Sequence, residues 1–181
     1  MSDTPSPSGP PPPDRIAKGM VYATWILVLV MLTWGFSQWF DAQRNPNQRV
    51  SSTMVEGGTQ IVLERNRYGH YNVNGNINGQ PVEFMLDTGA TWVAVPARLA
   101  DRLGLKRGHQ TQVRTANGTA VAYVTTLASV RLGDIEVRDV RALINPGMDG
   151  EEVLLGMSVL KNLEFSQRGN SLTLRQPQAQ H

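Results

Sequence analysis

The chain has 181 residues, of which 40% are hydrophobic and 18% charged, so it can form one modest globular domain with additional segments. Its net charge of +2 comes from intermixed signs, without a run of Lys or Arg long enough to follow a phosphate backbone, and we expect no nucleic-acid partner. The absence of cysteine excludes disulfides, thiol catalysis and thiolate zinc sites.

Residues 1–18 are expected to form a disordered, proline-rich N-terminal tail. Six of the eleven prolines fall within residues 1–14. This composition cannot bury a core and favours an extended chain. A docking site for a proline-recognising module is the alternative.

Residues 19–40 are predicted to form a transmembrane helix, because no charged residue lies between Lys18 and Asp41. The 22 residues at about 1.5 Å each reach roughly 30 Å, the thickness of a bilayer hydrocarbon core. Aromatic residues typical of interfacial belts lie near both ends: Tyr22, Trp25, Trp34 and Trp39. A cleaved signal peptide is the alternative, but the apolar stretch is long for one and no small-x-small cleavage site follows it.

Residues 41–58 are predicted to be a flexible stalk, because they are rich in Gln, Asn, Ser and Arg. As a coil, this stalk would have a mean span on the order of 20 to 25 Å, enough slack for two anchored domains to meet. Arg15 and Lys18 precede the apolar segment, and Arg44 and Arg49 follow it. The positive-inside bias therefore does not decide which end of the helix faces the cytoplasm.

From residue 59 the apolar pattern changes to a period of two, which predicts an all-β domain over 59–175 and a disordered tail over 176–181. The strands are expected at 60–65, 68–77, 82–86, 92–95, 111–115, 121–127, 129–132, 135–137, 140–144 and 172–174. Asn78-Gly79 predicts a hairpin turn. Short helices are expected at 96–103, ended by Gly104, and at 158–163, capped by Ser158. Many short strands and two small helices indicate a closed or folded-over β domain.

The sequence FMLDTGA, residues 84–90, places a single carboxylate, Asp87, directly after an apolar strand. An isolated ionised carboxylate among apolar neighbours is costly, so acids are seldom found there without a partner. We therefore expect Asp87 to pair with another group. A serine hydrolase is disfavoured, because the segment Gly156-Met157-Ser158 lacks the closing glycine of a nucleophile elbow. No histidine pair has zinc-binding spacing, and we expect no metal and no cofactor.

FMLDTGA and the later VLLG, residues 153–156, resemble the two signature segments of retropepsin-like (clan AA) aspartic proteases, in particular the membrane-anchored bacterial type. The resemblance covers roughly residues 69–174 and implies a closed β-barrel, the half-domain of an acid protease. It also implies that Asp87 is catalytic and that four residues support its loop: Thr88, Gly89, Leu155 and Gly156. Two departures concern dimer contacts and lid motion: Met157 follows Gly156 where viral members carry Arg, and the flap tip lacks a glycine-rich run.

By the same resemblance, substrate would contact Ala90 and the tip of a flap hairpin at Ala116, Asn117 and Gly118. An ordinary surface turn is the alternative for this hairpin. Peptide hydrolysis by carboxylates needs two acids that share one proton, and this chain offers one suitable loop.

The resemblance therefore implies an aspartic endopeptidase that is active as a homodimer, with each Asp87 meeting its symmetry mate. The expected partners are a second copy of the chain, a protein or peptide substrate, and the lipid bilayer through residues 19–40. The expected location is the cell inner membrane, single-pass, with the protease domain in the periplasm. The alternative is a catalytically silent protease-fold domain that acts as a peptide-binding or dimerisation module.

Overall fold

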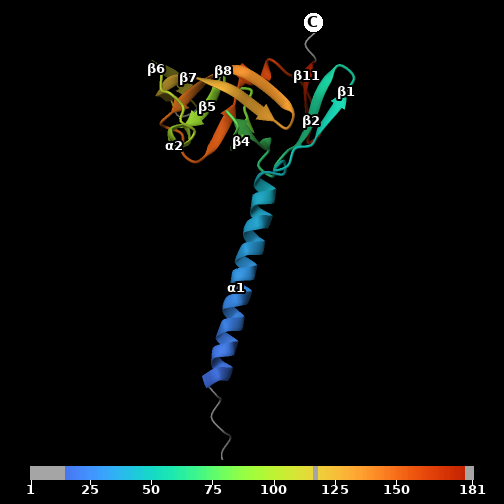
Figure 1. Cartoon of the computed structure of the whole chain (residues 1–181), viewed down its shortest axis with the longest axis vertical. Coiled ribbons are helices and arrows are strands. Elements are labelled where there is room, and N and C mark those ends of the chain that lie inside the picture. Colours follow the sequence, from blue (N-terminus) through green and yellow to red (C-terminus); the bar gives the residue numbers. More distant parts are fainter. Residues whose placement is uncertain (1–14, 116–117, 178–181) are drawn as a thin grey trace, which may run out of the picture. The chain divides into compact units, whose positions relative to one another are not determined.

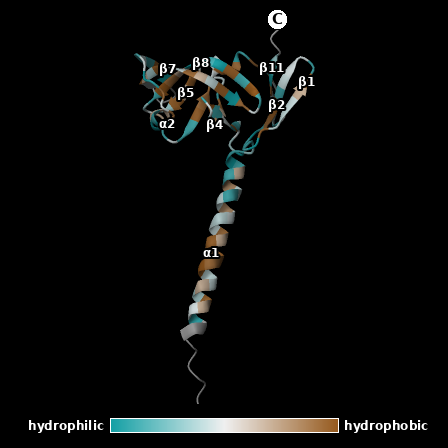
Figure 2. Cartoon of the chain, in the orientation of Figure 1, coloured by the Kyte–Doolittle hydropathy of each residue, from teal (hydrophilic) through white to brown (hydrophobic). Residues whose placement is uncertain are grey.

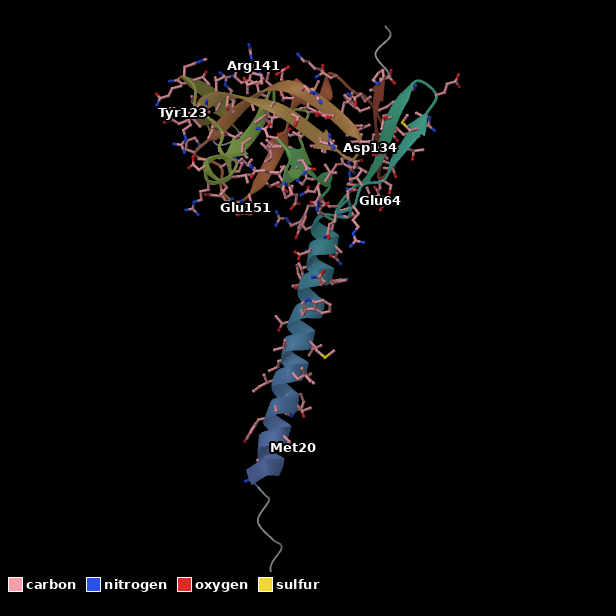
Figure 3. All side chains as sticks on the ribbon, in the orientation of Figure 1. Met20, Glu64, Tyr123, Asp134, Arg141 and Glu151 are labelled. Atoms are coloured by element: carbon pink, nitrogen blue, oxygen red, sulfur yellow. The ribbon has the colours of Figure 1, made fainter. Side chains whose placement is uncertain are left out.

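The computed structural model describes residues 15–115 and 118–177 and divides into two units that meet between Phe40 and Asp41. The first unit lies in helix α1 (Arg15–Arg44), whose large apolar side chains are 37–68% exposed up to Phe40 and project from all sides of the helix (Figure 3). Apolar residues are concentrated in its middle turns (Figure 2). The segment Lys18–Arg44 is long and apolar enough to cross a membrane.

Most strands of the second unit belong to one seven-stranded sheet (Figure 1). In spatial order they are β3 (Asn72–Ile77), β4 (Gln80–Leu86), β9 (Glu152–Leu155), β5 (Val93–Pro96), β8 (Ile135–Asn145), β7 (Gly118–Leu132) and β6 (Gln110–Thr115). A further antiparallel pairing joins β3 to β7 at Ile77 and Val130, and this pairing closes the sheet on itself. The prediction of an all-β, closed retropepsin-like fold is confirmed.

The remaining strands form a second, four-stranded sheet in the order β1 (Ser52–Val55), β2 (Gly58–Glu64), β11 (Ser171–Pro177) and β10 (Glu164–Arg168). Alternation of side chains between its two faces sets which residues are buried. Ile61 pairs with Leu174 and Leu63 with Leu172, and all four are buried in the core. Figure 1 shows β1, β2 and β11 side by side.

Two short helices complete the domain, α2 (Ala97–Arg102) and α3 (Met157–Leu160), and each buries two residues against the barrel: Leu99 and Ala100, and Val159 and Leu160. The predicted turn at Asn78-Gly79 is confirmed. Both residues have positive φ, 51° and 81°, as a two-residue hairpin turn of this kind requires. Gly104, with φ of 65°, ends the α2 segment as expected.

Several predicted boundaries are wrong. The strands expected at 121–127 and 129–132 are one strand, β7, and those at 135–137 and 140–144 are one strand, β8. Strand β8 has a local irregularity at Asp139, whose φ is 51°, but β7 and β8 pair in the same register on both sides of it. Strands β1 and β10 were not predicted.

The predicted ends of the chain also need correction. Helix α1 begins at Arg15, so residues 15–18 are helical, and β11 continues to Pro177, so residues 176–177 are strand. Residues 41–58 do not form a flexible stalk: α1 continues to Arg44, the side chains of Asn45 and Asn47 are buried, and Ser52–Val55 is a strand. The other residues of the two expected tails, 1–14 and 178–181, lie outside the described residues.

Candidate active site

The loop that carries Asp87 leaves β4 at the end of the sheet and returns as β5 on the other side of β9. Strand β9 is parallel to β4, with Leu155 opposite Leu86, and antiparallel to β5, with Leu154 opposite Ala94. Residues 87–92 therefore pass around the end of β9. This topology places FMLDTGA and VLLG, the two segments that resemble the family signatures, next to each other.

Main-chain hydrogen bonds fix the position of Asp87. Its N–H donates to the carbonyl of Leu155 at 3.2 Å, and the preceding N–H, of Leu86, donates to the carbonyl of Tyr71 at 3.0 Å. Its own carbonyl accepts from Ala90 N–H at 3.2 Å. The carboxylate oxygen Oδ1 accepts from Gly89 N–H at 2.8 Å, the local turn that Asp favours. Asp87 is half-buried.

Gly156 lies against the backbone of this loop. A Cβ at this position would stand 2.6 Å from the carbonyl oxygen of Ala90 and would also collide with the carbonyl of Trp92. Main-chain atoms cannot rotate away as the end of a flexible side chain can, so the absence of a side chain at Gly156 permits the contact. Leu155, which is fully buried, supplies the carbonyl to Asp87. The structure thus brings both predicted support residues of the second segment to the loop.

The start of α3 holds the far side of the loop. Met157 N–H donates to the carbonyl of Ala90 at 2.8 Å and Ser158 N–H to that of Thr91 at 2.9 Å. The hydroxyl of Ser158 accepts from Val93 N–H at 3.0 Å.

Ser158 is therefore not the helix cap that the sequence predicted. Gly156 occupies that position and makes no side-chain capping bond. The hydrogen bond from Val93 to Ser158 was not predicted, because the two residues lie far apart in the sequence and no local pattern links them.

A cleft of about 1010 Å³ opens beside Asp87. The loop contributes Asp87, Gly89, Ala90, Thr91 and Trp92, and the β6–β7 hairpin contributes Thr111, Gln112, Val113, Arg114, Thr119 and Ala120. Residues that sequence reasoning did not single out complete the lining: Ala94, Leu143, Asn145, Gly147, Met148 and Leu154. Among the described residues that line the cleft, Asp87 is the only acid.

The remaining predicted site residues have different positions. Thr88 is exposed and does not line the cleft, whereas Ala90 does. Gly118 begins β7 next to the cleft residue Thr119. Ala116 and Asn117, at the tip of the hairpin, lie outside the described residues.

The ion pair between Arg102 and Glu151 is exposed. Within residues 15–115 and 118–177, no group of three or more His, Cys, Asp or Glu side chains could hold a metal ion. The hydrogen bond from Arg102 to Glu151, 2.6 Å between Nη1 and Oε1, lowers the pKa of the Glu151 carboxyl. Arg102 ends α2 and Glu151 immediately precedes β9, so this pair joins α2 to the start of β9. The guanidinium of Arg141 on β8 (Figure 3) lies 5.6 Å from the ring centre of Trp92.

Comparison with known proteins agrees with this arrangement. Residues 73–162 match the family described as gag-polyprotein putative aspartyl protease. The crystal structure of a retropepsin-like aspartic protease from Rickettsia conorii is 29% identical and covers 71% of this chain and 94% of its own, with a TM-score of 0.55.

Uncharacterized proteins from two bacteria are also similar in sequence. One from a Sinorhizobium species is 28% identical over 84% of this chain and 71% of its own length. One from Rickettsia prowazekii is 27% identical over 78% of this chain, a match that spans 64% of that protein. The two signature segments, their convergence on one loop and these matches together assign the chain to the retropepsin-like aspartic protease family.

Proposed function

We propose that the protein is a membrane-anchored aspartic endopeptidase that is active as a homodimer. Each chain would contribute one Asp87, and the two carboxylates would activate water for hydrolysis of a peptide bond. The single observation that carries this proposal is that the described part of the cleft contains one acid, on the loop characteristic of the family, where the chemistry requires two.

The exposure of this loop supports a shared site. Thr88 and Gly89 are exposed beside a half-buried Asp87, although the strands behind them are packed into the core. A two-fold axis beside this surface would bring each residue to its own image. The second copy would then cover Thr88 and Gly89 and place the second carboxylate next to the first, as the family pattern implies.

The proposed chemistry divides two roles between the carboxyl groups. The ionised one takes a proton from water, and the water oxygen attacks the carbonyl carbon of the substrate. The protonated one donates its proton to the carbonyl oxygen. The first carboxyl then gives the proton that it took from water to the amide nitrogen, the C–N bond breaks, and the amine leaves. A hydroxyl of the tetrahedral intermediate returns a proton to the second carboxylate, which leaves a carboxylic acid on the other product and one shared proton on the pair. No part of this step needs a cofactor.

Helix α1 supports the anchoring part of the proposal. Its apolar side chains between Met20 and Phe40 are exposed, as in a helix that lipid surrounds. Anchoring both copies in one membrane raises their effective concentration and favours the dimer. We place the chain in the cell inner membrane, crossing it once, with the protease domain in the periplasm.

The direct test uses the full chain in lipid vesicles and a broad peptide library. We expect wild type to cleave and Asp87→Asn to abolish cleavage, with the unfolding midpoint unchanged. Asp139→Asn is a matched control, because Asp139 is an exposed acid outside the cleft and Asn tolerates its positive φ of 51°. This control should cleave like wild type.

Cleavage by Asp87→Asn at the wild-type rate would contradict the proposal. Peptide binding by the wild-type dimer without cleavage at any pH would instead favour the catalytically silent binding module.

A further inference from the structure

The segment that joins the anchor to the protease domain is held against the domain by hydrogen bonds. The division between the two units falls after Phe40, so the last helical residues, Asp41 to Arg44, belong to the domain unit. The residues that follow do not lead away from the domain. Instead, the main chain at Asn47 pairs with Val73 of β3 in a parallel bridge.

We call residues 41–47 and their contacts with the domain the joint, and Asn47 makes its most buried contacts. Its side chain is 6% exposed and makes three hydrogen bonds to main-chain groups. Nδ2 donates to the carbonyls of Glu64 at 2.9 Å and Asn72 at 2.7 Å, and Oδ1 accepts from Glu64 N–H at 2.7 Å. Glu64 ends β2 (Figure 3) and Asn72 begins β3, so one side chain holds both sheets to the segment that follows the helix.

Other residues fix the end of the helix itself. Asn66 Nδ2 donates to the carbonyl of Arg44 at 2.9 Å, and Arg67 donates to the side chain of Gln43 at 2.8 Å. Asn45, which is 4% exposed, donates to the side chain of Asn74 at 2.9 Å. The guanidinium of Arg44 also faces Glu83 and Glu152, at 3.7 and 3.9 Å.

The joint limits how far the catalytic loop can lie from the end of the apolar span. Asn47 neighbours Val73, and Val73 pairs with Phe84 of β4. Asp87 follows Phe84 by three residues and is the first residue after this strand. Two strand spacings of about 4.8 Å and three residues of about 3.3 Å keep the Asp87 Cα within roughly 20 Å of that of Asn47.

The chain from Asn47 back to the anchor is also short. Three residues lead from Asn47 to Arg44, at most about 10 Å when extended. Four helical residues then lead to Phe40, about 6 Å. Whatever the tilt of the domain on the helix, Asp87 lies within roughly 35 Å of the last apolar residue of the anchor. A free 18-residue stalk could instead extend to about 60 Å.

We infer that the substrates of this protease are proteins anchored in the same membrane, and that it cuts them in segments within roughly 35 Å of the bilayer surface. This inference rests on the proposed function. The joint limits how far the cleft can lie from the bilayer. A shared membrane supplies the local concentration that favours an anchored substrate over a soluble one.

The test is a series of reporters of different height, placed in the same vesicles as the full-length protease. Each reporter has one membrane span, a rigid helical spacer and an identical susceptible sequence. Spacers of 0, 20 and 40 residues place that sequence at about 0, 30 and 60 Å from the bilayer. We expect cleavage of the shortest reporter to be at least about tenfold faster than that of the longest.

A variant of the protease tests whether the joint sets this height. Twenty helix-forming residues inserted between Phe40 and Asp41 should move the preferred height outward by about 30 Å. The same twenty residues placed ahead of Arg15 are the matched control and should leave the preference unchanged.

Equal cleavage of all three reporters, or a preference that the first insertion does not move, would overturn the inference. A free peptide of the same sequence separates this outcome from failure of the proposed function. If no variant cleaves the free peptide, the proposed protease activity fails; if all cleave it equally while the reporters show no height preference, only the height inference fails.

Discussion

Replacing Asn47 with alanine should destabilise the protease domain, although the sequence places this residue in a polar segment typical of a loose linker. The substitution removes three hydrogen bonds and leaves two carbonyls and one N–H of the neighbouring strands without their partner. A buried polar group that loses its partner costs about 1–3 kcal/mol, and water can reach part of the opened site. We therefore expect a loss of about 2–4 kcal/mol in the free energy of unfolding.

The assay is pulse proteolysis of the full chain across a urea series in detergent micelles, which reports the folded fraction without relying on the tryptophans of α1. With a urea dependence of about 2 kcal/mol per molar, the midpoint should fall by about 1–2 M. Asn76→Ala is the matched control, because the Asn76 side chain makes one long, exposed hydrogen bond of 3.4 Å to Gly79. It should shift the midpoint by less than about 0.3 M. Equal urea midpoints for the two variants would contradict the claim that the Asn47 hydrogen bonds hold this segment to the domain.

Two further predictions concern the contacts beneath the catalytic loop. Gly156→Ala should cost about 1–3 kcal/mol in unfolding free energy and slow peptide cleavage, because the new Cβ meets the carbonyls of Ala90 and Trp92; an unchanged cleavage rate would contradict this contact. Ser158→Ala should cost about 1–2 kcal/mol, because Val93 N–H loses its acceptor, whereas Ser158→Thr keeps the hydroxyl and should retain most of the activity. Equal stability of the two Ser158 variants in urea unfolding would show that this hydrogen bond does not hold the loop.

The closed β fold could be predicted because its signals are local. Alternation with a period of two marks β4, in which Val82 and Phe84 are buried, and Asn78-Gly79 marks the turn before it. The loop at Asp87 was also evident, since an acid directly after an apolar strand is unusual. These features need no knowledge of distant segments.

The features that sequence reasoning missed depend on contacts between distant segments. By composition, Asn45 and Asn47 are typical linker residues. In the fold both are buried, because the side chain of Asn45 bonds to Asn74 and that of Asn47 bonds to the strand ends at Glu64 and Asn72. All five residues of β10 are exposed, so that strand has no apolar alternation to detect. Neither the position of β9 between β4 and β5 nor the bond from Val93 to Ser158 leaves a local pattern in the sequence.

Mixing experiments test the shared active site most directly. Wild-type chains and Asp87→Asn chains are combined in detergent in known proportions, allowed to exchange, and reconstituted together at constant total protein. If each site needs an Asp87 from both chains, cleavage falls with the square of the wild-type fraction, to about a quarter at equal amounts. Mixing with Asp139→Asn chains should leave cleavage unchanged. A linear fall, to about half at equal amounts, would show that one chain suffices and would contradict the account.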